Sequence, residues 1–259
     1  MRIARFSARG QTGYGVIRND VIHSLGSDPF SGWETGTELK FDGRTYPLSE
    51  TRLLAPCLPS KLVCLGLNYR PHAREFDQAP PSSPLIFLKP STAVIGPESP
   101  IILPHNWKRV DYEGELGIVI GKTARHVTEE KAREYILGCT CTNDVTERQI
   151  QKEDGQWTRA KGFDTFAPIG PWIETEVEPD DLVLETYLNG ELRQSARTSE
   201  LVFGISSLIS FISGIMTLLP GDIIATGTPA GIAPMRPGDT VEVKIEGIGS
   251  LRNPVKGPV

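Results

Sequence analysis

Short apolar runs separated by turn residues dominate the chain and predict a protein built mainly from β-strands. Continuous apolar runs at 62–67, 85–88 and 116–120 predict buried strands. Residues 240–246 begin with strict alternation of apolar and polar side chains, which is typical of a strand with one buried face. Asn189-Gly190 lies between two strand-like segments and predicts a tight hairpin. The pattern favours antiparallel or mixed sheets over a regular alternation of strands and helices.

Helical periodicity is confined to a few segments. Residues 206–216 carry apolar side chains at positions 208, 209, 212, 215 and 216, which form one face of an amphipathic helix. Segment 128–137 predicts a second helix, with Thr128 as its N-cap and Gly138 in the left-handed position after its last turn. The expected fold class is therefore α+β, mainly β with a few helices.

The first 55 residues form a segment of their own. Residues 14–17 and 21–25 flank the polar stretch 18–20, which predicts a hairpin. A segment of this length is too short to enclose a large core by itself. We expect residues 1–55 to be a small N-terminal β domain packed on a main, catalytic domain of residues 56–259.

Composition and charge exclude several classes of protein. The 259 residues include 27 basic and 32 acidic ones, a net charge of −5, which gives no reason to expect binding to nucleic acid or an anionic membrane. Four cysteines are too few for a disulfide framework. The N-terminus lacks the apolar core of a secretory signal, and the longest apolar stretch, 208–219, is shorter than the ~20 residues that span a bilayer. We expect a soluble, cytoplasmic protein whose partner is a small molecule.

Three acidic residues alternate at the start of the strand-like segment 110–121. Asp111, Glu113 and Glu115 would share one face of a strand, with i and i+2 positions roughly 6–7 Å apart. Such like charges repel unless a cation lies between them, and Mg²⁺ prefers carboxylate oxygens. The alternative is an edge strand with a solvated acidic face, and the spacing leaves both interpretations open.

Four further residues have a possible chemical role and an ordinary structural one. Asp144 ends a strand-like segment and is either a third metal ligand or the cap of a following short helix. His72 and Glu75, three positions apart, either form a dyad in which the carboxylate orients a general base or are a surface pair. Lys161 is either an oxyanion stabiliser or a solvated lysine.

A loop of small residues follows at 225–231. Backbone N–H groups of such a loop, together with Thr228, can bind a carboxylate, although the pattern by itself is weak. It is not a nucleotide-binding Walker A loop, because the Gly-Lys-Ser/Thr sequence is missing.

Taken together, these segments resemble the fumarylacetoacetate hydrolase family from about residue 61 to residue 255. The similarity is carried by many short motifs in one order: Asn68-Tyr69 with His72 and Glu75, Phe87-Leu88-Lys89-Pro90-Ser91, 111–115, Asn143-Asp144, Ala160-Lys161-Gly162-Phe163-Asp164, Asn189-Gly190, and 221–231. The resemblance implies a mixed β-roll core and a homodimer. The segment before residue 56 is much shorter than the N-terminal domain of the long fumarylacetoacetases, which favours the shorter bacterial-type members.

The resemblance also implies a set of site residues. It assigns a divalent metal, with Mg²⁺ first and Mn²⁺ or Ca²⁺ as alternatives, to Glu113, Glu115 and Asp144. The water-activating pair corresponds to His72 and Glu75, on a segment (70–83) that we expect to close over substrate as a lid. The remaining positions are the oxyanion-stabilising Lys161 and the substrate-binding residues Arg148, Gln151 and Thr228.

These residues predict a metal-dependent enzyme that acts on 2-oxo or 2-hydroxy-dienoate carboxylates, because a metal can stabilise the enolate that cleavage next to a 2-oxo acid generates. The first hypothesis is hydrolytic C–C cleavage of acylpyruvate-type substrates. The alternative is an isomerase or decarboxylase of aromatic-acid catabolism, of the 2-hydroxyhepta-2,4-diene-1,7-dioate isomerase or oxaloacetate decarboxylase type. A non-catalytic metal- or carboxylate-binding module is a third hypothesis.

Overall fold

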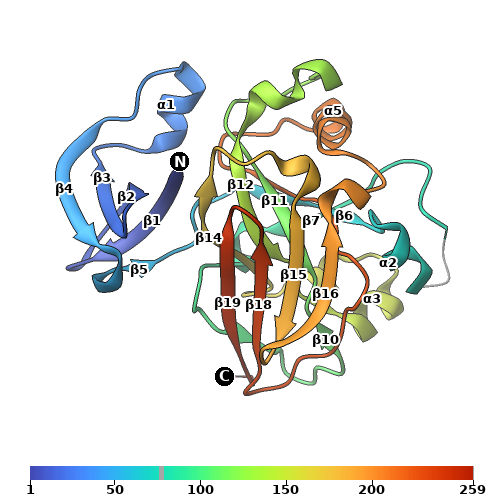
Figure 1. The fold of residues 1–259 in the computed structure, drawn as a ribbon. Helices are drawn as coiled ribbons and strands as arrows, with labels where there is room; N and C mark the ends of the chain where they lie inside the picture. Colours follow the sequence, from blue (N-terminus) through green and yellow to red (C-terminus); the bar gives the residue numbers. More distant parts are fainter. Residues whose placement is uncertain (76–78, 259) are drawn as a thin grey trace.

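The computed structural model describes residues 1–75 and 79–258, and most of its regular structure is β-sheet (Figure 1). Within these residues the largest sheet mixes antiparallel pairs with parallel ones, such as β6 with β17. Its strand order is β4 (Phe41–Pro47), β3 (Val21–Leu25), β2 (Gln11–Arg18), β1 (Arg2–Ala8), β14 (Ala167–Glu174), β12 (Ile136–Asn143), β11 (Gly114–Ile120), β17 (Ile223–Ala225), β6 (Lys61–Gly66) and β7 (Leu85–Pro90), with β5 (Arg52–Leu53) paired to β1 and β8 (Val94–Ile95) paired to β14.

A second sheet packs against the middle of the first, and Figure 1 shows its strands in front of β11 and β12. Its order is β16 (Glu191–Arg197), β15 (Val183–Leu188), β18 (Thr240–Ile245), β19 (Gly249–Lys256) and β9 (Ile101–Ile102). The short strands β10 (Val110–Asp111) and β13 (Thr146–Glu147) pair with each other. These stacked, mixed sheets confirm the predicted fold class.

Helices are few and short in the described residues. The longest is α5, the amphipathic helix that the sequence predicts. No described helix combines the length and the apolar character that crossing a membrane requires. The α-helices are α1 (Pro29–Thr35), α2 (Arg70–Glu75), α3 (Arg148–Asp154), α4 (Thr158–Lys161) and α5 (Ile205–Ile215), and the 3₁₀ helices are η1 (Leu48–Glu50), η2 (Ser91–Ala93), η3 (Glu129–Tyr135), η4 (Pro179–Asp181) and η5 (Thr198–Glu200).

Strand β11 lies at the centre of the main sheet, between β12 and β17, and is buried along its whole length. Leu116 and Ile118 pack in one core cluster with the second sheet and α5, and Val119 packs on the opposite face in another cluster. Burial on both faces explains the continuous apolar run, since each such side chain contributes roughly 1.5–3 kcal/mol when removed from water.

The segment 128–137 differs from its prediction. It forms the 3₁₀ helix η3, Thr128 makes no side-chain cap, and the chain enters β12 at Ile136. Gly138 does not end a helix, because it lies inside β12, where a Cβ would lie 2.4 Å from the carbonyl oxygen of Glu174. The last residues of the predicted helix, from Ile136 on, therefore form a strand instead, because β12 pairs with β11 on one side and with β14 on the other.

The N-terminal hairpin is confirmed, with Asn19 and Asp20 in its turn at φ angles of 47° and 59°. The N-terminal segment also contains α1, whose N-cap Asp28 accepts from the backbone N–H of Phe30 and Ser31. Its strands do not form a separate sheet, because β1 pairs with β14 of the main body. Figure 1 shows the segment at the left-hand side of the molecule.

Candidate active site

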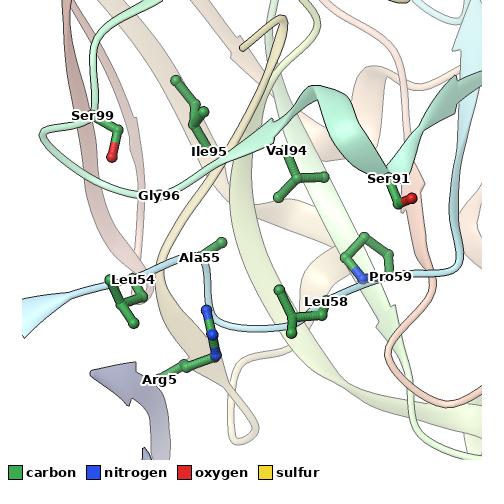
Figure 2. A pocket seen from close by; sticks show the side chains of 10 residues that line it. All are labelled: Arg5, Leu54, Ala55, Leu58, Pro59, Ser91, Val94, Ile95, Gly96 and Ser99. Atoms are coloured by element: carbon green, nitrogen blue, oxygen red, sulfur yellow. The ribbon is translucent and has the colours of Figure 1, made fainter. Parts of the chain in front are cut away.

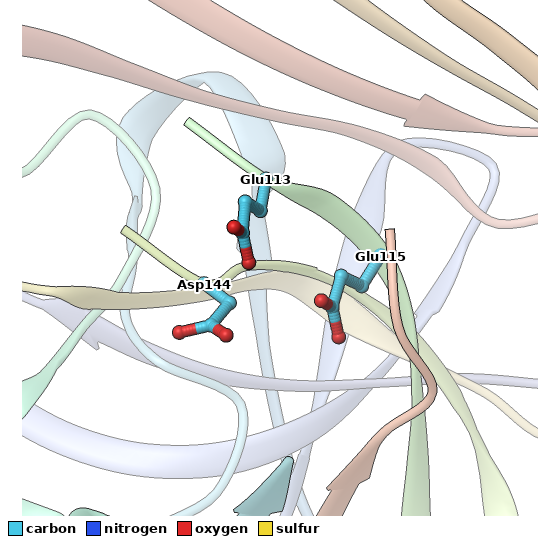
Figure 3. Close-up of side chains that lie close together, drawn as sticks. All are labelled: Glu113, Glu115 and Asp144. Atoms are coloured by element: carbon cyan, nitrogen blue, oxygen red, sulfur yellow. The ribbon is translucent and has the colours of Figure 1, made fainter. Parts of the chain in front are cut away.

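Three buried carboxylates meet where β11 begins and β12 ends (Figure 3). Glu113 precedes β11, Glu115 lies within it, and Asp144 follows β12 directly. The register pairs Gly114 with Asn143, and the backbone N–H of Asp144 donates to the carbonyl oxygen of Glu113 at 2.9 Å. One oxygen from each carboxylate lies within 4.8 Å of the others. The alternative of a solvated acidic face is wrong, because this strand is central and the carboxylates are buried.

Of the three carboxylates, Glu115 has the fewest hydrogen-bond partners among the described residues and no ion pair with them. Its Oε2 accepts from the backbone N–H of Gly227 at 2.9 Å, but no residue that the structure describes donates to Oε1. Burial, and then the neighbouring Asp144 and Glu113, raise its pKa well above the ordinary 4.5. A buried, unpaired carboxylate oxygen beside two other carboxylates fits a divalent cation, which prefers such oxygens.

Glu113 is held differently. Its carboxylate accepts from Lys161 Nζ at 2.8 Å and from Nη2 of Arg148. Burial alone would raise its pKa, but the charges of Arg148 and Lys161 outweigh burial and lower it below the ordinary value. Glu113 therefore stays ionised beside a neighbour, Glu115, that is driven toward its neutral form.

Two buried lysines bond to Asp144. Lys161 Nζ donates to Oδ2 at 2.5 Å, and Lys89 Nζ donates to Oδ1 at 2.6 Å and to the carbonyl oxygen of Val145 at 2.9 Å. Burial would lower the pKa of Lys161, but Asp144 and Glu113 outweigh it and raise the pKa. Burial lowers the pKa of Lys89. The alternative of a solvated Lys161 is wrong, because only 2% of the residue is exposed.

Lys89 is a residue of this cluster to which the sequence analysis gave no role. Its signal was the presence of a charged side chain in the otherwise apolar strand β7, a position that a buried lysine occupies only with a partner. Asp144, in turn, is not the cap of the following helix. Glu147 caps α3, because its Oε2 accepts from the backbone N–H of Ile150 at 2.6 Å.

Asp111 stands apart from the three clustered carboxylates, although it shares their spacing in the sequence. The chain leaves the strand at residues 112 and 113, between β10 and β11. Arg109 donates to Asp111 through Nε at 2.9 Å and Nη2 at 3.1 Å, and Arg148 donates through Nε at 2.8 Å. Nη1 of Arg148 also bonds to Oε1 of Gln151 at 3.0 Å, so Arg148 links three polar partners.

His72 and Glu75 lie on α2 and form the predicted dyad. Nδ1 of His72 is 2.8 Å from Oε2 of Glu75, and the other carboxylate oxygen accepts from the backbone N–H of Gly231 at 2.8 Å. Glu75 is exposed, but only 5% of His72 is, so the imidazole is not the surface histidine of the alternative interpretation. Of the predicted lid, residues 76–78 lie outside the described part of the chain.

Thr228 lies in the predicted loop of small residues and is fixed by two side-chain contacts. Its hydroxyl donates to the carbonyl oxygen of Gly114 at 2.9 Å and accepts from Nε2 of Gln194 at 2.8 Å. The buried Gln194, which the sequence analysis did not single out, also donates to the carbonyl oxygen of Pro229 at 2.7 Å. The loop is thereby tied to the start of β11, next to the carboxylates.

One pocket of about 600 Å³ connects these groups. Seven of the nine predicted site residues line it, and the other two, Glu115 and Asp144, are buried with carboxylate oxygens within 4.8 Å of one of Glu113. The lining residues are Leu65, Gly66, Leu67, His72, Glu75, Arg109, Asp111, Glu113, Arg148, Gln151, Lys152, Trp157, Lys161, Thr228 and Ile232. The structure thus brings the predicted residues to a single site.

A second hollow, of about 290 Å³, lies between β1 and the segments 54–59 and 91–99 (Figure 2). Among its described lining residues Arg5 is the one charged side chain, and the others are mostly apolar. It holds no acid–base pair and no group of carboxylates, so the larger pocket is the candidate active site.

Residues 61–256 match the family described as fumarylacetoacetate (FAA) hydrolase C-terminal. The chain belongs to the fumarylacetoacetate hydrolase family. Residues 1–56 match a second family, described as Rv2993c-like, N-terminal. The resemblance found in the sequence is therefore confirmed, and members of this family are enzymes.

Relatives of this fumarylacetoacetate hydrolase family member include one whose name states no activity and one that is named as a hydrolase. It is 55% identical to Protein Rv2993c of Mycobacterium tuberculosis, over 83% of this chain and 82% of that one. It is 38% identical to a 2,4-didehydro-3-deoxy-L-rhamnonate hydrolase of Sphingomonas sp., over 98% and 96% of the two chains.

Solved structures of the family share the fold over the whole chain. A 2-hydroxyhepta-2,4-diene-1,7-dioate isomerase from Mycobacterium marinum is 46% identical, with a TM-score of 0.91 over 99% of this chain and 98% of that one. A maleylpyruvate hydrolase from Sphingobium sp. SYK-6, in complex with manganese(II) and pyruvate, is 33% identical, with a TM-score of 0.82 over 100% of both chains. The family thus includes both hydrolases and isomerases.

Proposed function

We propose that this protein is a divalent-metal-dependent hydrolase that cleaves a C–C bond in acylpyruvate-type 2-oxo acids. The observation that carries the proposal is the His72–Glu75 pair, because it lines the same pocket as Glu113 and Lys161. Attack by water on a carbonyl needs a base to remove a proton, whereas decarboxylation and tautomerisation do not need an attacking water. A base next to the carboxylate cluster therefore favours hydrolysis.

Glu113, Glu115 and Asp144 would hold the metal ion. The unpaired Oε1 of Glu115 and the short separations among the three carboxylates support this assignment. The all-oxygen donor set suits Mg²⁺, our first choice, and also Mn²⁺ or Ca²⁺. When bound, such an ion supplies Lewis-acid stabilisation of the negative charge that develops at the 2-oxo end of the substrate.

The chain's own residues supply the base and a charge for the oxyanion. With Nδ1–H donating to Glu75, the Nε2 atom of His72 takes the proton from water as the water oxygen bonds to the distal carbonyl carbon. Two protons of the Lys161 ammonium bond to Glu113 and Asp144, which leaves the third for the developing oxyanion. The C–C bond next to that carbon then breaks, and its electron pair leaves as the enolate of pyruvate. The proton held on Nε2 of His72 is returned to the carbon of that enolate, so the products are a carboxylic acid and pyruvate.

Arg148, Gln151 and Thr228 bind and orient the substrate in this proposal. Arg148 is held in place by Asp111 and Gln151, so its guanidinium needs little ordering when substrate binds. The Thr228 hydroxyl proton is directed to Gly114, and the backbone N–H of Thr228 has no acceptor among the described residues. The backbone therefore offers the donor for a substrate carboxylate.

A second candidate is an isomerase or decarboxylase of aromatic-acid catabolism. This candidate is supported by the relative from Mycobacterium marinum, which is named a 2-hydroxyhepta-2,4-diene-1,7-dioate isomerase and is 46% identical to this chain. The same carboxylates and Lys161 would serve these reactions without water activation. The third candidate is a non-catalytic module that binds a metal or a carboxylate. This candidate would be excluded if a chelator abolished turnover of a substrate and added Mg²⁺ or Mn²⁺ restored it.

The test is a substrate panel of acylpyruvates, oxaloacetate and hydroxy-dienoates with Mg²⁺ and Mn²⁺, applied to the wild type and to His72→Ala. We expect pyruvate release from acylpyruvates and a loss of about 10²-fold or more in His72→Ala, the usual contribution of a general base. His105→Ala, which changes an exposed histidine outside the pocket, is the matched control. Failure to cleave any acylpyruvate, while His72→Ala retains decarboxylation or tautomerisation, would reject the hydrolase.

Three further expectations belong to the proposal. We expect residues 1–55 and 56–259 to be two domains, and every proposed site residue lies in the second of them. The protein is expected to be a homodimer, which the molar mass in solution tests. The location in the cell is expected to be the cytoplasm, which cell fractionation tests.

A further inference from the structure

The smaller hollow lies where the N-terminal segment meets the main body (Figure 2). Arg5 and Leu54 belong to the residues that match the N-terminal family, whereas Val94 and Ser99 belong to those that match the hydrolase family. The hollow has a volume of about 290 Å³, and the described residues that line it are all different from those that line the candidate active site. A ligand bound there would therefore be separate from the substrate of the proposed reaction.

Arg5 carries the positive charge of this hollow. Along β1 it shares a face with Ile3, which is fully buried in a core cluster of the main sheet. Arg5 itself is partly buried, and its guanidinium forms no hydrogen bond or ion pair with any residue that the structure describes. Because partial burial of a charged group without a partner is unfavourable, this position favours an acceptor supplied by a ligand.

The surroundings of Arg5 offer it no negative charge. None of the described residues that line the hollow is acidic. Arg5 is close enough to Tyr14 and Cys57 to lower the pKa of each, but burial outweighs this effect and raises both pKa values. Both side chains are therefore neutral at pH 7. An uncompensated cation in a hollow attracts an anion.

The rest of the hollow combines apolar side chains with two hydroxyl groups. In Figure 2 the Arg5 side chain projects between Leu54 and Leu58, and Leu58 is 67% exposed. An apolar ligand that covered Leu58 would remove this surface from water, which is favourable. The hydroxyl groups of Ser91 and Ser99 also line the hollow, and neither makes a hydrogen bond within the described part of the chain.

We propose that this hollow binds a small monocarboxylic acid with an apolar body. The guanidinium of Arg5 donates to both carboxylate oxygens, which its planar donors match, and the body lies against Leu54, Leu58 and Val94. Because these contacts come from the N-terminal segment and from the main body, the bound acid stabilises the folded protein by holding the two together. This inference does not depend on the proposed function.

The test is a calorimetric titration with 4-methylpentanoate, which has both the charge and the apolar body. Acetate keeps the carboxylate without the body, and 4-methylpentanamide keeps the body without the charge. We expect each of these two to bind at least about tenfold more weakly, because one loses buried apolar surface and the other a hydrogen bond between charged groups. Equal affinity for acetate would mean an adventitious anion contact, and equal affinity for the amide would mean no recognition of charge. Either result overturns the inference.

Two variants place the binding in this hollow. Arg5→Met should weaken binding of 4-methylpentanoate by about tenfold or more. It should leave the melting temperature of the ligand-free protein nearly unchanged, because Arg5 has no side-chain partner to lose among the described residues. Arg52→Met, the matched control, removes an exposed arginine of β5, which pairs with β1 outside the hollow, and should keep the wild-type affinity.

The outcome separates this inference from the hydrolase. Wild-type affinity in Arg5→Met, or failure of 4-methylpentanoate to bind the wild type, overturns the acid site, whether or not the protein releases pyruvate from acylpyruvates. Loss of hydrolysis in His72→Ala, with 4-methylpentanoate binding retained, supports two separate sites, because His72 does not line this hollow.

Discussion

Replacing Glu115 and Glu113 by glutamine should change the stability of the metal-free protein in opposite directions. Glu115 has an unpaired buried oxygen and a pKa raised by burial, Asp144 and Glu113. Glu113 is bonded to Lys161 and Arg148, whose charges lower its pKa. The two residues are two positions apart and both are buried, so the difference comes from their partners.

The magnitude for Glu115→Gln follows from proton linkage. An acid whose folded-state pKa is raised binds more protons folded than unfolded, so its contribution to stability is favourable at low pH and is lost as pH rises above 4.5. At about 1.4 kcal/mol per pH unit, removing this group gains at most about 3.5 kcal/mol at pH 7, the limit for a carboxyl group that stays neutral in the folded protein up to that pH. Glutamine keeps the acceptor for the Gly227 N–H and places an amide donor beside Asp144.

Glu113→Gln has the opposite sign. It removes the negative partner of two buried cations, Lys161 and Arg148. Breaking a buried ion pair from one side costs about 3–5 kcal/mol, and here Asp144 and Asp111 still partner the two cations, so we expect about 2–3 kcal/mol.

Urea unfolding with a chelator present, at pH 5 and pH 7, measures both effects. We expect Glu115→Gln to be more stable than the wild type at pH 7 and nearly equal to it at pH 5, and Glu113→Gln to be less stable at both. Calorimetric titration should show lost Mg²⁺ affinity in both variants. Equal destabilisation by the two substitutions, or a gain in Glu115→Gln that does not depend on pH, would refute this account of the site.

Three other predictions follow from the same structure. Mg²⁺ binding should release protons, because the pKa of Glu115 is raised in the metal-free protein and Glu115 must ionise to bind the ion, and calorimetry in buffers of different ionisation enthalpy measures it. Lys89→Met should weaken Mg²⁺ binding about 10–100-fold, because Lys89 orients Asp144. Lys61→Met, which breaks a partly buried pair with Asp222 outside the site, should leave the affinity unchanged. Gly138→Ala should lower the melting temperature by several degrees, because its Cβ would lie 2.4 Å from a backbone oxygen of β14.

Local patterns in the sequence predicted several of the strands and marked His72, Glu75 and the acidic residues of 111–115 as candidates, whereas Arg148 and Gln151 were assigned only through the resemblance to the family. The run 116–120 is apolar on both faces because β11 is covered on both sides, and that requirement is visible in the sequence itself. The dyad spacing of His72 and Glu75 is likewise local, since three positions bring two side chains together on one helical turn.

The partners of the charged residues were decided by the tertiary structure. Asp111, Glu113 and Glu115 have the same spacing, yet the break between β10 and β11 sends Asp111 to two arginines and leaves the other two with Asp144. The sequence also does not indicate that Lys89 reaches Asp144, 55 positions away. Strand pairing between distant segments sets these contacts, and a charge in a protein is satisfied by whichever groups the folded chain brings within a few ångströms of it.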